Sequence, residues 1–538
     1  MKFIFLLFLF PLFSFSQKKT TDQDTLRGTI NSERSWWNLI RYDLTVQPDF
    51  ASKTIKGKNI IYFEVLEKSN FMQIDLQEPM QIDSVSFEGK LVKFIREENV
   101  FHLNFSGIEL KDKKQSIVVY YSGKPREAVR APWDGGWIWS KDKMDRPWMS
   151  VACQGLGASV WYPCKDHQSD EPDSGVTFTM ILPDTLVGVS NGRLVEVKEY
   201  SKGFVSSSWE VLNPINNYNI VPYIGKYVHW GELYMGEKGS LDCDYWVLDY
   251  NLEKAKKQFE QVPKMLKCFE HWFGPYPFYE DSYKLVQAPF LGMEHQSAVA
   301  YGNNFENGYL GTDLSRSGWG YKWDYILVHE SGHEWFGNNI TTKDIADMWV
   351  HEGFTTYSET IYTMCQFGIE AGNEYQNGLR RSISNNIPII GQYGVNKEGS
   401  GDMYSKGSNL IHIIRQLIED DDKFRLLLRG LNEDFYHKTV TTFEIEQYIN
   451  TKIGIDCSLL FDQYLRTVDI PKLEYKVEDN VLLCRWTDCV KGFNLKVKLK
   501  NGKWISPTEN WTKIDIKLKK KEELAIDPNF YIKVKRIN

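Results

Sequence analysis

The sequence of 538 residues is short of cysteine, of long apolar runs and of excess positive charge. Eight cysteines are too few for disulfides to hold together a chain of this length. None precedes Cys153, which removes the usual attachment point for a lipid anchor close behind the N-terminus. The sequence leaves open whether Cys153 pairs with Cys164, or Cys484 with Cys489, in an oxidising compartment.

Positive charge is also scarce, because 64 Lys and Arg residues face 71 Asp and Glu residues and give a net charge of −7. This balance provides no basic footprint for a nucleic-acid partner. An apolar content of 42% and an aromatic content of 14% are typical of a globular chain rather than a disordered one. The length predicts roughly three domains at about 150 residues each.

The first residues contain an apolar run from Phe3 to Phe13, followed by the small residues Ser14 and Ser16. The run is too short for the ~20 residues that a spanning helix needs, so an N-terminal membrane anchor is the weaker interpretation. The layout is typical of a cleavable secretory signal, with cleavage expected between Ser16 and Gln17. The sequence therefore predicts a protein that is exported to the periplasm or secreted, without stable membrane insertion.

Hydrophobic periodicity changes twice along the chain. Polar and apolar residues alternate from about Trp36 to about Leu233, which predicts a largely antiparallel β domain. From about Asn251 the apolar residues recur at helical spacing, and Pro263 is expected to kink the first of these helices. Helical patterns then dominate until about Pro471, where the alternation returns.

Two short signals refine this pattern. Thr441 followed three residues later by Glu444 is a capping-box start for one of the last helices. Asn501-Gly502 predicts a tight hairpin in the last β region.

The stretch "HESGHEWFGN", residues 329–338, carries the strongest chemical signal. Residues four apart share one face of a helix, so His329 and His333 can aim their rings at one metal ion. Glu330 projects to a neighbouring side, close enough to act on water without being a ligand. Coincidence produces this spacing in roughly one such chain in a hundred, so the motif alone is only suggestive.

A catalytic zinc needs a third protein ligand and an open position for water. The metzincin pattern is excluded, because Phe336 and Asn339 stand where that class requires glycine and histidine. Glu352, nineteen positions after His333, fits as a carboxylate ligand supplied by a second helix. A surface or capping role is the alternative for Glu352.

With the third ligand in place, the text "HEWFGNNIT…WVHEGFTTYSE" resembles the gluzincin zinc aminopeptidases of peptidase family M1. The family signature, HExxH followed after eighteen residues by Glu, is met by His329, Glu330, His333 and Glu352. The resemblance implies one Zn2+ per chain, held by the two histidines and Glu352, with Glu330 as the general base. It also implies substrates that are peptides with a free N-terminus.

A second stretch, "LGMEH" at residues 291–295, is similar to the family's GxMEN motif. The resemblance places Gly292, Met293 and Glu294 in the substrate site, with Glu294 binding the free α-ammonium group. Leu291 and His295 stand where the family has glycine and asparagine.

Two further residues follow from the resemblance, and a third from helical spacing alone. "YSKG" makes Tyr404 the phenol that donates a hydrogen bond to the oxyanion, and "CQGLGASVWYPC" places Gln154 beside Glu294 at the amino group. A structural polar role is the alternative for Gln154. Glu359 lies two helical turns after Glu352 and on the same face, where it can orient a ligand imidazole. An exposed glutamate is the equal alternative for Glu359.

The resemblance covers about residues 36–538 and implies a multidomain α and β protein. Its parts are an N-terminal β saddle, a thermolysin-like α-rich catalytic domain and a short C-terminal β module, without the large C-terminal helical domain of many relatives. The predicted bounds are 1–16 for the signal peptide, 17–235 for the β domain, 236–470 for the zinc peptidase domain and 471–538 for the β module.

The predicted function is a zinc-dependent aminopeptidase that releases N-terminal residues by metal-activated water attack. The alternatives are an endopeptidase, an epoxide hydrolase and a catalytically silent peptide-binding scaffold. The endopeptidase is disfavoured, because a buried carboxylate at position 294 would penalise a chain that continues past that point. The sequence does not specify the preferred first residue or the oligomeric state.

Overall fold

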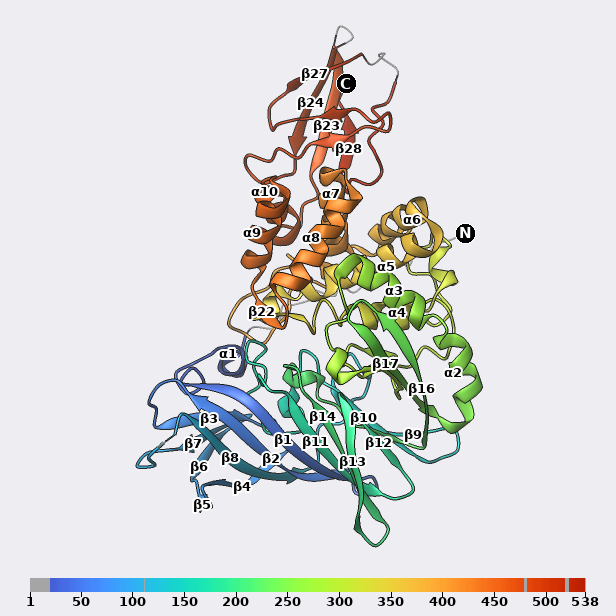
Figure 1. Ribbon diagram of the computed structural model, residues 1–538. Helices are drawn as coiled ribbons and strands as arrows, with labels where there is room; N and C mark the ends of the chain where they lie inside the picture. The colour runs from blue at the N-terminus through green and yellow to red at the C-terminus, as the bar shows by residue number, and fades with distance from the viewer. Residues whose placement is uncertain (1–19, 111, 479–480, 518–521, 538) are drawn as a thin grey trace, which may run out of the picture.

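The computed structural model describes residues 20–110, 112–478, 481–517 and 522–537. The predicted signal peptide, residues 1–16, lies outside the described residues. Figure 1 shows a β-rich N-terminal part at the bottom, a helix-rich part above it and a small β part at the top. The predicted fold class is confirmed by this order.

The N-terminal part is built on a sheet in which β1 runs parallel to β11 and the other neighbouring strands are antiparallel. Burial alternates along β1, so one face of the sheet packs on the core. The strands in sheet order are β13 (Arg193–Ser201), β14 (Phe204–Val211), β11 (Val176–Pro183), β1 (Trp37–Asp49), β2 (Thr54–Val65), β8 (Lys114–Gly123), β4 (Gln81–Phe87) and β5 (Lys90–Leu91).

Two smaller sheets complete this part. One contains β3 (Phe71–Asp75), β7 (Val100–Asn104) and β6 (Phe94–Glu97), and the other β12 (Val187–Val189), β15 (Tyr223–Gly225), β10 (Pro147–Ala152) and β9 (Gly136–Lys141).

The boundary predicted between residues 235 and 236 falls at the end of a strand. β16 (Tyr227–Gly236) forms a hairpin with β17 (Gly239–Leu248), and β17 runs parallel to β18 (Tyr283–Gln287). The same sheet continues through β20 (Val299–Tyr301) to β19 (Gly292–Met293). Hydrogen bonding thus joins residues 227–236 to the helix-rich part.

The helix-rich part begins with two helices where one kinked helix was predicted. α2 (Leu252–Phe259) and α3 (Val262–Phe273) are separate, and Pro263 lies in the first turn of α3. A proline is tolerated there because the first-turn N–H groups have no partner within the helix. The prediction of a kink was therefore wrong.

The remaining helices follow in order. They are α4 (Tyr325–Gly332), α5 (Trp349–Phe367), α6 (Ile369–Leu379), α7 (Ser405–Ile418), α8 (Asp421–Asp434), α9 (Thr442–Ile453) and α10 (Ser458–Arg466), with the strand pair β21 (Ile340–Thr342) and β22 (Lys438–Val440) between them. The predicted capping box is confirmed at the start of α9, where Thr441 and Glu444 exchange side-chain and backbone hydrogen bonds. In the described part of the chain, no helix has the length and apolarity that a membrane crossing requires.

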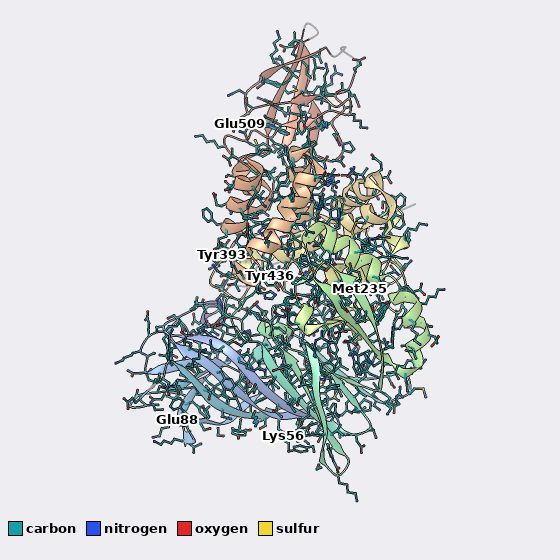
Figure 2. All side chains as sticks on the ribbon, in the orientation of Figure 1. Lys56, Glu88, Met235, Tyr393, Tyr436 and Glu509 are labelled. Atoms are coloured by element: carbon teal, nitrogen blue, oxygen red, sulfur yellow. A yellow bond between two sulfur atoms is a disulfide. The ribbon has the colours of Figure 1, made fainter. Side chains whose placement is uncertain are left out.

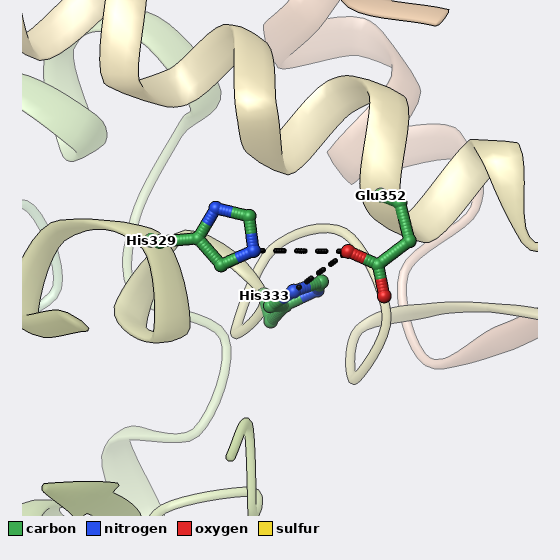
Figure 3. Close-up of side chains that lie close together, drawn as sticks. All are labelled: His329, His333 and Glu352. Atoms are coloured by element: carbon green, nitrogen blue, oxygen red, sulfur yellow. Dashed lines mark ion pairs between the residues drawn. The ribbon is translucent and has the colours of Figure 1, made fainter. Parts of the chain in front are cut away.

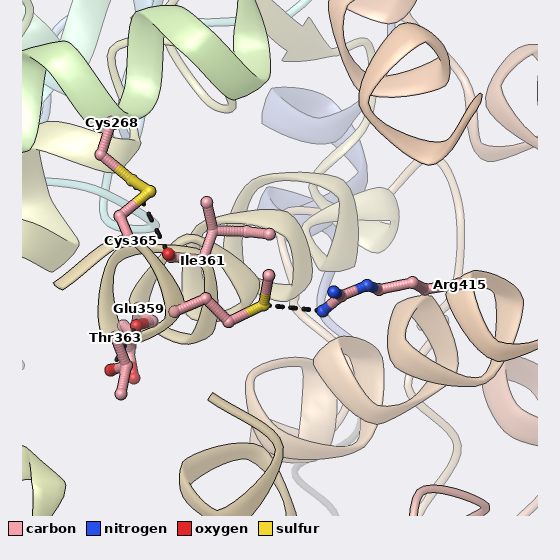
Figure 4. Close-up of a disulfide and its surroundings, with 7 residues drawn as sticks. Cys268, Glu359, Ile361, Thr363, Cys365 and Arg415 are labelled. Carbon is pink, nitrogen blue, oxygen red and sulfur yellow. Dashed lines mark hydrogen bonds between the residues drawn. A yellow bond between two sulfur atoms is a disulfide. The ribbon is translucent and has the colours of Figure 1, made fainter. Parts of the chain in front are cut away.

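A disulfide joins Cys268 in α3 to Cys365 in α5 (Figure 4). Neither pairing considered from the sequence forms, because Cys153, Cys164, Cys484 and Cys489 are all free thiols. The bond that does form joins two cysteines 97 residues apart in sequence, and it links α3 to α5, the helix that carries Glu352.

The C-terminal β part has strands in the order β27 (Thr512–Lys517), β24 (Val481–Thr487), β23 (Lys472–Glu478) and β28 (Lys533–Arg536). β25 (Val497–Lys498) and β26 (Trp504–Ile505) form the predicted hairpin. Its turn places Gly502 at φ 85°, a left-handed conformation that favours glycine. The hairpin signal at Asn501-Gly502 is thus confirmed.

Candidate metal centre and substrate pocket

The two histidines of the motif lie on and directly after α4. Asp324 caps the helix by accepting a hydrogen bond from the backbone N–H of Leu327 at 3.2 Å. The helix ends at Gly332, but His333 keeps right-handed helical dihedrals of −64° and −20°. The spacing of four therefore still places the rings of His329 and His333 on one face.

A close helix crossing brings Glu352 to this face. Gly332 lies against α5, where an added Cβ atom would stand 2.4 Å from Ser358 Oγ, so the missing side chain allows a close approach. Glu352 is in the first turn of α5, and its Oε2 atom lies 3.7 Å from His329 Nε2 and 3.4 Å from His333 Nε2 (Figure 3). The structure thus brings together the three residues predicted as metal ligands.

The other ring nitrogens have partners that fix the two imidazoles. His329 Nδ1 lies 2.7 Å from Glu359 Oε1, and His333 Nδ1 lies 3.0 Å from the carbonyl oxygen of Phe336. Both partners are acceptors, which makes Nδ1 the donor and leaves the Nε2 lone pairs facing Glu352.

Glu359 is buried and also accepts a hydrogen bond of 2.6 Å from the Tyr375 hydroxyl. The alternative of an exposed glutamate at this position is excluded.

The donor set fits a zinc ion. Glu352 Oε2 is buried and has no hydrogen-bond partner within the described residues. Ligand atoms about 2.0–2.1 Å from a tetrahedral zinc lie about 3.3 Å apart, close to the separations found here. Burial by itself would raise the pKa of Glu352, but His333 and His329 hold it below its usual range. The carboxylate is therefore ionised and ready to bind a cation.

Glu330 faces the same pocket without becoming one of these three donors. No hydrogen bond to its carboxylate occurs in the part of the chain that the structure describes. Burial raises the pKa of Glu330 to about 7, while His329 and His333 oppose the shift. Gly292 passes so close that an added Cβ atom would lie 2.8 Å from Glu330 Oε1, which explains the need for glycine in the "GMEH" segment.

A third carboxylate, Glu294, lines the same pocket. Its Oε1 atom accepts hydrogen bonds from Gln154 Nε2 at 2.7 Å and from the Tyr218 hydroxyl at 2.8 Å. Burial raises its pKa. Gln154, Gly292, Met293 and Glu294 all line the pocket, so the structure brings the predicted substrate residues together.

His295, which departs from the family pattern, turns away from the pocket. Its Nδ1 atom lies 2.6 Å from the Tyr223 hydroxyl, and the side chain is fully buried. The departure therefore leaves Glu294 free to face the pocket.

Tyr404 lines the same pocket and directly precedes α7. Gly407 of this helix crosses Gly353 of α5 so closely that an added Cβ atom would lie 3.2 Å from Gly353 Cα. The Tyr404 ring stacks on His329 with centroids 6.0 Å apart and planes at 20°. Its hydroxyl has no hydrogen-bond partner within the described residues, so it can donate to a bound molecule.

Two residues of the site carried no signal that the sequence interpretation used. Tyr218, which donates a hydrogen bond to Glu294, lies in a short 3-10 turn after a β region. Glu398, which lines the pocket, lies in a polar loop without periodicity. Burial raises the pKa of Glu398 to about 7, with added repulsion from Glu352 and Glu294. Trp133 also reaches the rim. Only the three-dimensional fold brings these loops to the metal centre.

Comparison with known proteins connects this site to a family. The profile of the peptidase M1 N-terminal domain matches residues 39–218, and that of the peptidase family M1 domain matches residues 257–464. Leukotriene A-4 hydrolase of Xenopus laevis is 22% identical over 82% of this chain and 73% of its own length. Aminopeptidase B of Mus musculus is 24% identical over 61% of this chain, and aminopeptidase N of Lactobacillus helveticus is 22% identical over 80% of this chain. The chain spans about half the length of each, namely 50% of aminopeptidase B and 51% of aminopeptidase N.

Solved structures share the fold. A mutant M1 zinc metallopeptidase from Deinococcus radiodurans, bound to a Tyr-Ser-Ala substrate, superposes with a TM-score of 0.68 at 17% identity. The match covers 81% of this chain and 95% of that protein. The M1 zinc metallopeptidase from the same organism without that mutation gives a TM-score of 0.66 at 18% identity, over 79% of this chain and 92% of that protein. The architecture around the site is thus the one found in these metallopeptidases.

Proposed function

The chain belongs to peptidase family M1, and from this premise we propose that it is a zinc-dependent aminopeptidase that removes single residues from the free N-terminus of peptides. The observation that carries the proposal is the position of Glu294. This buried carboxylate, held by Gln154 and Tyr218, lines the pocket beside the His329, His333 and Glu352 cluster.

His329, His333 and Glu352 would hold one zinc ion. Zinc in such a site acts as a Lewis acid that polarises a carbonyl group and acidifies water. The protein supplies two neutral imidazoles and one carboxylate, so about one net positive charge remains at the centre. Glu359 fixes the ring of His329 through the 2.7 Å hydrogen bond at Nδ1.

Glu294 and Gln154 would bind the cationic amino terminus of the substrate. Charge-assisted hydrogen bonds of this kind contribute about 1.5–3 kcal/mol each. They would fix the first peptide carbonyl beside the metal ligands. A chain that continued past this point would place an uncharged amide against the buried carboxylate, which costs free energy. One residue is therefore released in each turnover.

Glu330 and Tyr404 would carry the proton transfer and the oxyanion stabilisation. Glu330 takes a proton from the attacking water and passes it to the leaving amine. Burial raises the pKa of the Glu330 carboxyl above its usual value, which makes its carboxylate a better proton acceptor. The free Tyr404 hydroxyl donates a hydrogen bond to the oxyanion, an interaction that is strongest in the transition state.

Hydrolysis of aminoacyl anilides tests the proposed function. The purified protein is expected to cleave them, to lose activity on treatment with a chelator and to regain it with Zn2+. A zinc-loaded, folded protein that cleaves no anilide or peptide would favour the silent-scaffold or epoxide hydrolase alternatives.

Replacing Glu359 by Gln is expected to weaken zinc binding about 10- to 100-fold, because an amide no longer fixes the His329 ring as an anionic acceptor does. Competition with a zinc-sensitive chelating dye measures this affinity directly. The control is Glu370→Gln on the exposed surface of α6, which should leave zinc affinity unchanged. Equal zinc affinity of the Glu359→Gln variant and the control would disprove the orienting role.

Glu398 adds a negative charge to the pocket, so first residues with cationic side chains should be favoured. In the Glu398→Gln variant, the ratio of kcat/KM for an arginyl anilide to kcat/KM for a leucyl anilide is expected to fall about tenfold, which corresponds to the loss of one charge-assisted hydrogen bond.

Because burial and the carboxylates of Glu294 and Glu352 raise the pKa of Glu398 to about 7, the group is neutral below that pH and charged above it. The arginyl preference of the unmodified protein should therefore grow as pH rises through this value. An unchanged ratio in the variant would exclude this selectivity.

We also infer export through the N-terminal segment, with a final location in the periplasm or outside the cell. The support is the apolar run and small residues of segment 1–16. N-terminal sequencing of protein from culture fractions tests this: a chain that starts at Gln17 supports export, and one that retains Met1 contradicts it.

A further inference from the structure

Residues 20–34, which we term the N-terminal strap, lie between the β domain and the helix-rich part. The strap contains α1 (Asp22–Gly28), which Figure 1 shows at the junction of the two parts. It precedes the residues matched by the family's N-terminal domain profile, 39–218. Its contacts lead to the two loops that carry Gln154 and Glu398.

The first contact is with the loop of residues 153–159, which carries Gln154. Arg27 Nη2 donates a hydrogen bond of 2.5 Å to the carbonyl oxygen of Leu156 and pairs with Asp166 at 3.1 Å. Asp166 in turn accepts hydrogen bonds from the backbone N–H groups of Ala158 and Ser159 at 3.1 and 3.2 Å. The Arg27 guanidinium thus fixes this loop both directly and through Asp166.

The second contact is with the loop of residues 391–399, which carries Glu398. The carbonyl oxygen of Asp24 accepts a hydrogen bond of 3.0 Å from the Asn396 backbone N–H. Gly28 packs on the backbone of Val395, where an added Cβ atom would stand 2.4 Å from the carbonyl carbon. In Figure 2, Tyr393 of the same loop lies at the junction of the helices and the β domain. The strap therefore presses directly on the backbone of this loop.

The two loops also contact each other. Asn396 Nδ2 donates a hydrogen bond of 3.0 Å to the carbonyl oxygen of Gly155, the residue after Gln154. An added Cβ atom on Gly155 would lie 3.2 Å from Glu398 Oε1. Gln154 and Glu398 thus approach the pocket from two loops that meet under the strap.

The strap is itself held by a buried cation. Arg34 Nη1 donates hydrogen bonds of 2.8 and 3.0 Å to the carbonyl oxygens of Arg27 and Thr29, and Nη2 pairs with Asp75. The side chains of Arg34 and Asp75 are fully buried. A buried ion pair that is also hydrogen-bonded to the backbone fixes the strap relative to the β domain.

We propose that the N-terminal strap is a positioning element of the substrate pocket, which sets the relative placement of Gln154 and Glu398 and so the affinity for the substrate's first residue. This inference rests on the proposed function. Arg27 and Gly28 act through the two loops and touch none of the residues assigned to zinc or proton transfer. Loosening the strap should therefore affect substrate binding more than the chemical step.

The test uses two variants of the full chain with a matched control. Arg27→Ala removes the hydrogen bond to Leu156 and the ion pair with Asp166. Gly28→Ala adds a methyl group that collides with the backbone of Val395, and Gly28 does not have the left-handed backbone conformation that would itself disfavour alanine. Arg41→Ala is the control, because Arg41 pairs with Glu210 at 2.9 Å in the same β domain and lies outside the pocket. The readouts are kcat and KM for an arginyl anilide, and hydrogen exchange of residues 153–159 and 391–399.

In both strap variants we expect KM to rise about tenfold, because that is the effect of losing one well-placed charged contact. We expect kcat to stay within about twofold of that of the unmodified protein. Exchange in the two loops should become faster, and the control should change neither quantity. Faster exchange with an unchanged KM would overturn the proposal, as would equal losses in kcat in the strap variants and the control. Gly28→Ala keeps the test valid if Arg27→Ala does not fold. If the unmodified protein cleaves no anilide, the proposed function fails, while the exchange data still report whether the strap holds the loops.

Discussion

Replacement of Glu330 by Gln is expected to lower kcat by about 10²–10⁴-fold, the range that general acid–base groups supply. The glutamine is nearly isosteric, so it fits beside Gly292 as the glutamate does, but it cannot take a proton from water. Because the proposed zinc ligands are His329, His333 and Glu352, and Glu330 is not among them, the zinc content should remain at one ion per chain. Steady-state kinetics together with metal analysis check both quantities.

The control for this variant is again Glu370→Gln, an exposed glutamate of α6 that should keep full activity. Retention of more than about a tenth of kcat in the Glu330→Gln variant would contradict the assignment of the general base. Loss of zinc together with activity would instead mean that Glu330 helps to hold the metal.

Replacement of Tyr404 by Phe is expected to lower kcat by about 10²–10³-fold with a small change in KM, as for loss of one oxyanion donor. The hydroxyl has no partner within the described residues, and burial raises the pKa of Tyr404 well above its usual value. The phenol therefore stays protonated at neutral pH and keeps its hydrogen for the oxyanion. Phenylalanine preserves the ring that stacks on His329, so the zinc ligands should be undisturbed.

Tyr321→Phe serves as the matched control, because Tyr321 is exposed and lies outside the pocket. The distinguishing readout is the split between kcat and KM, since an oxyanion donor acts in the transition state and a binding group acts on the bound substrate as well. A kcat of the Tyr404→Phe variant within about twofold of the unmodified protein would exclude the assignment.

The features that could be predicted from the sequence are those set by local geometry. The helical spacing of His329 and His333, the capping box at Thr441 and the turn at Gly502 depend on residues a few positions apart. Glu352 is not close to the histidines in sequence, and it was predictable because its spacing from them matches the signature of peptidase family M1.

The features that escaped prediction depend on loops and on long-range packing. Glu398 lines the pocket and Tyr218 donates a hydrogen bond to Glu294, and both come from segments far from the motif in sequence. The disulfide joins Cys268 to Cys365 because α3 packs on α5, a contact that sequence spacing does not reveal. Pro263 shows the reverse problem: a proline inside a helical pattern marks either a kink or a new first turn, and the local sequence fits both.

The central claim, that Glu294 anchors a free amino terminus, is tested most directly by hydrolysis of one short peptide with its N-terminus either free or acetylated. The account predicts that the free peptide is cleaved one residue at a time and that acetylation removes cleavage, because the uncharged amide cannot form an ion pair with Glu294. Equal cleavage of the two peptides would contradict the account and identify the protein as an endopeptidase.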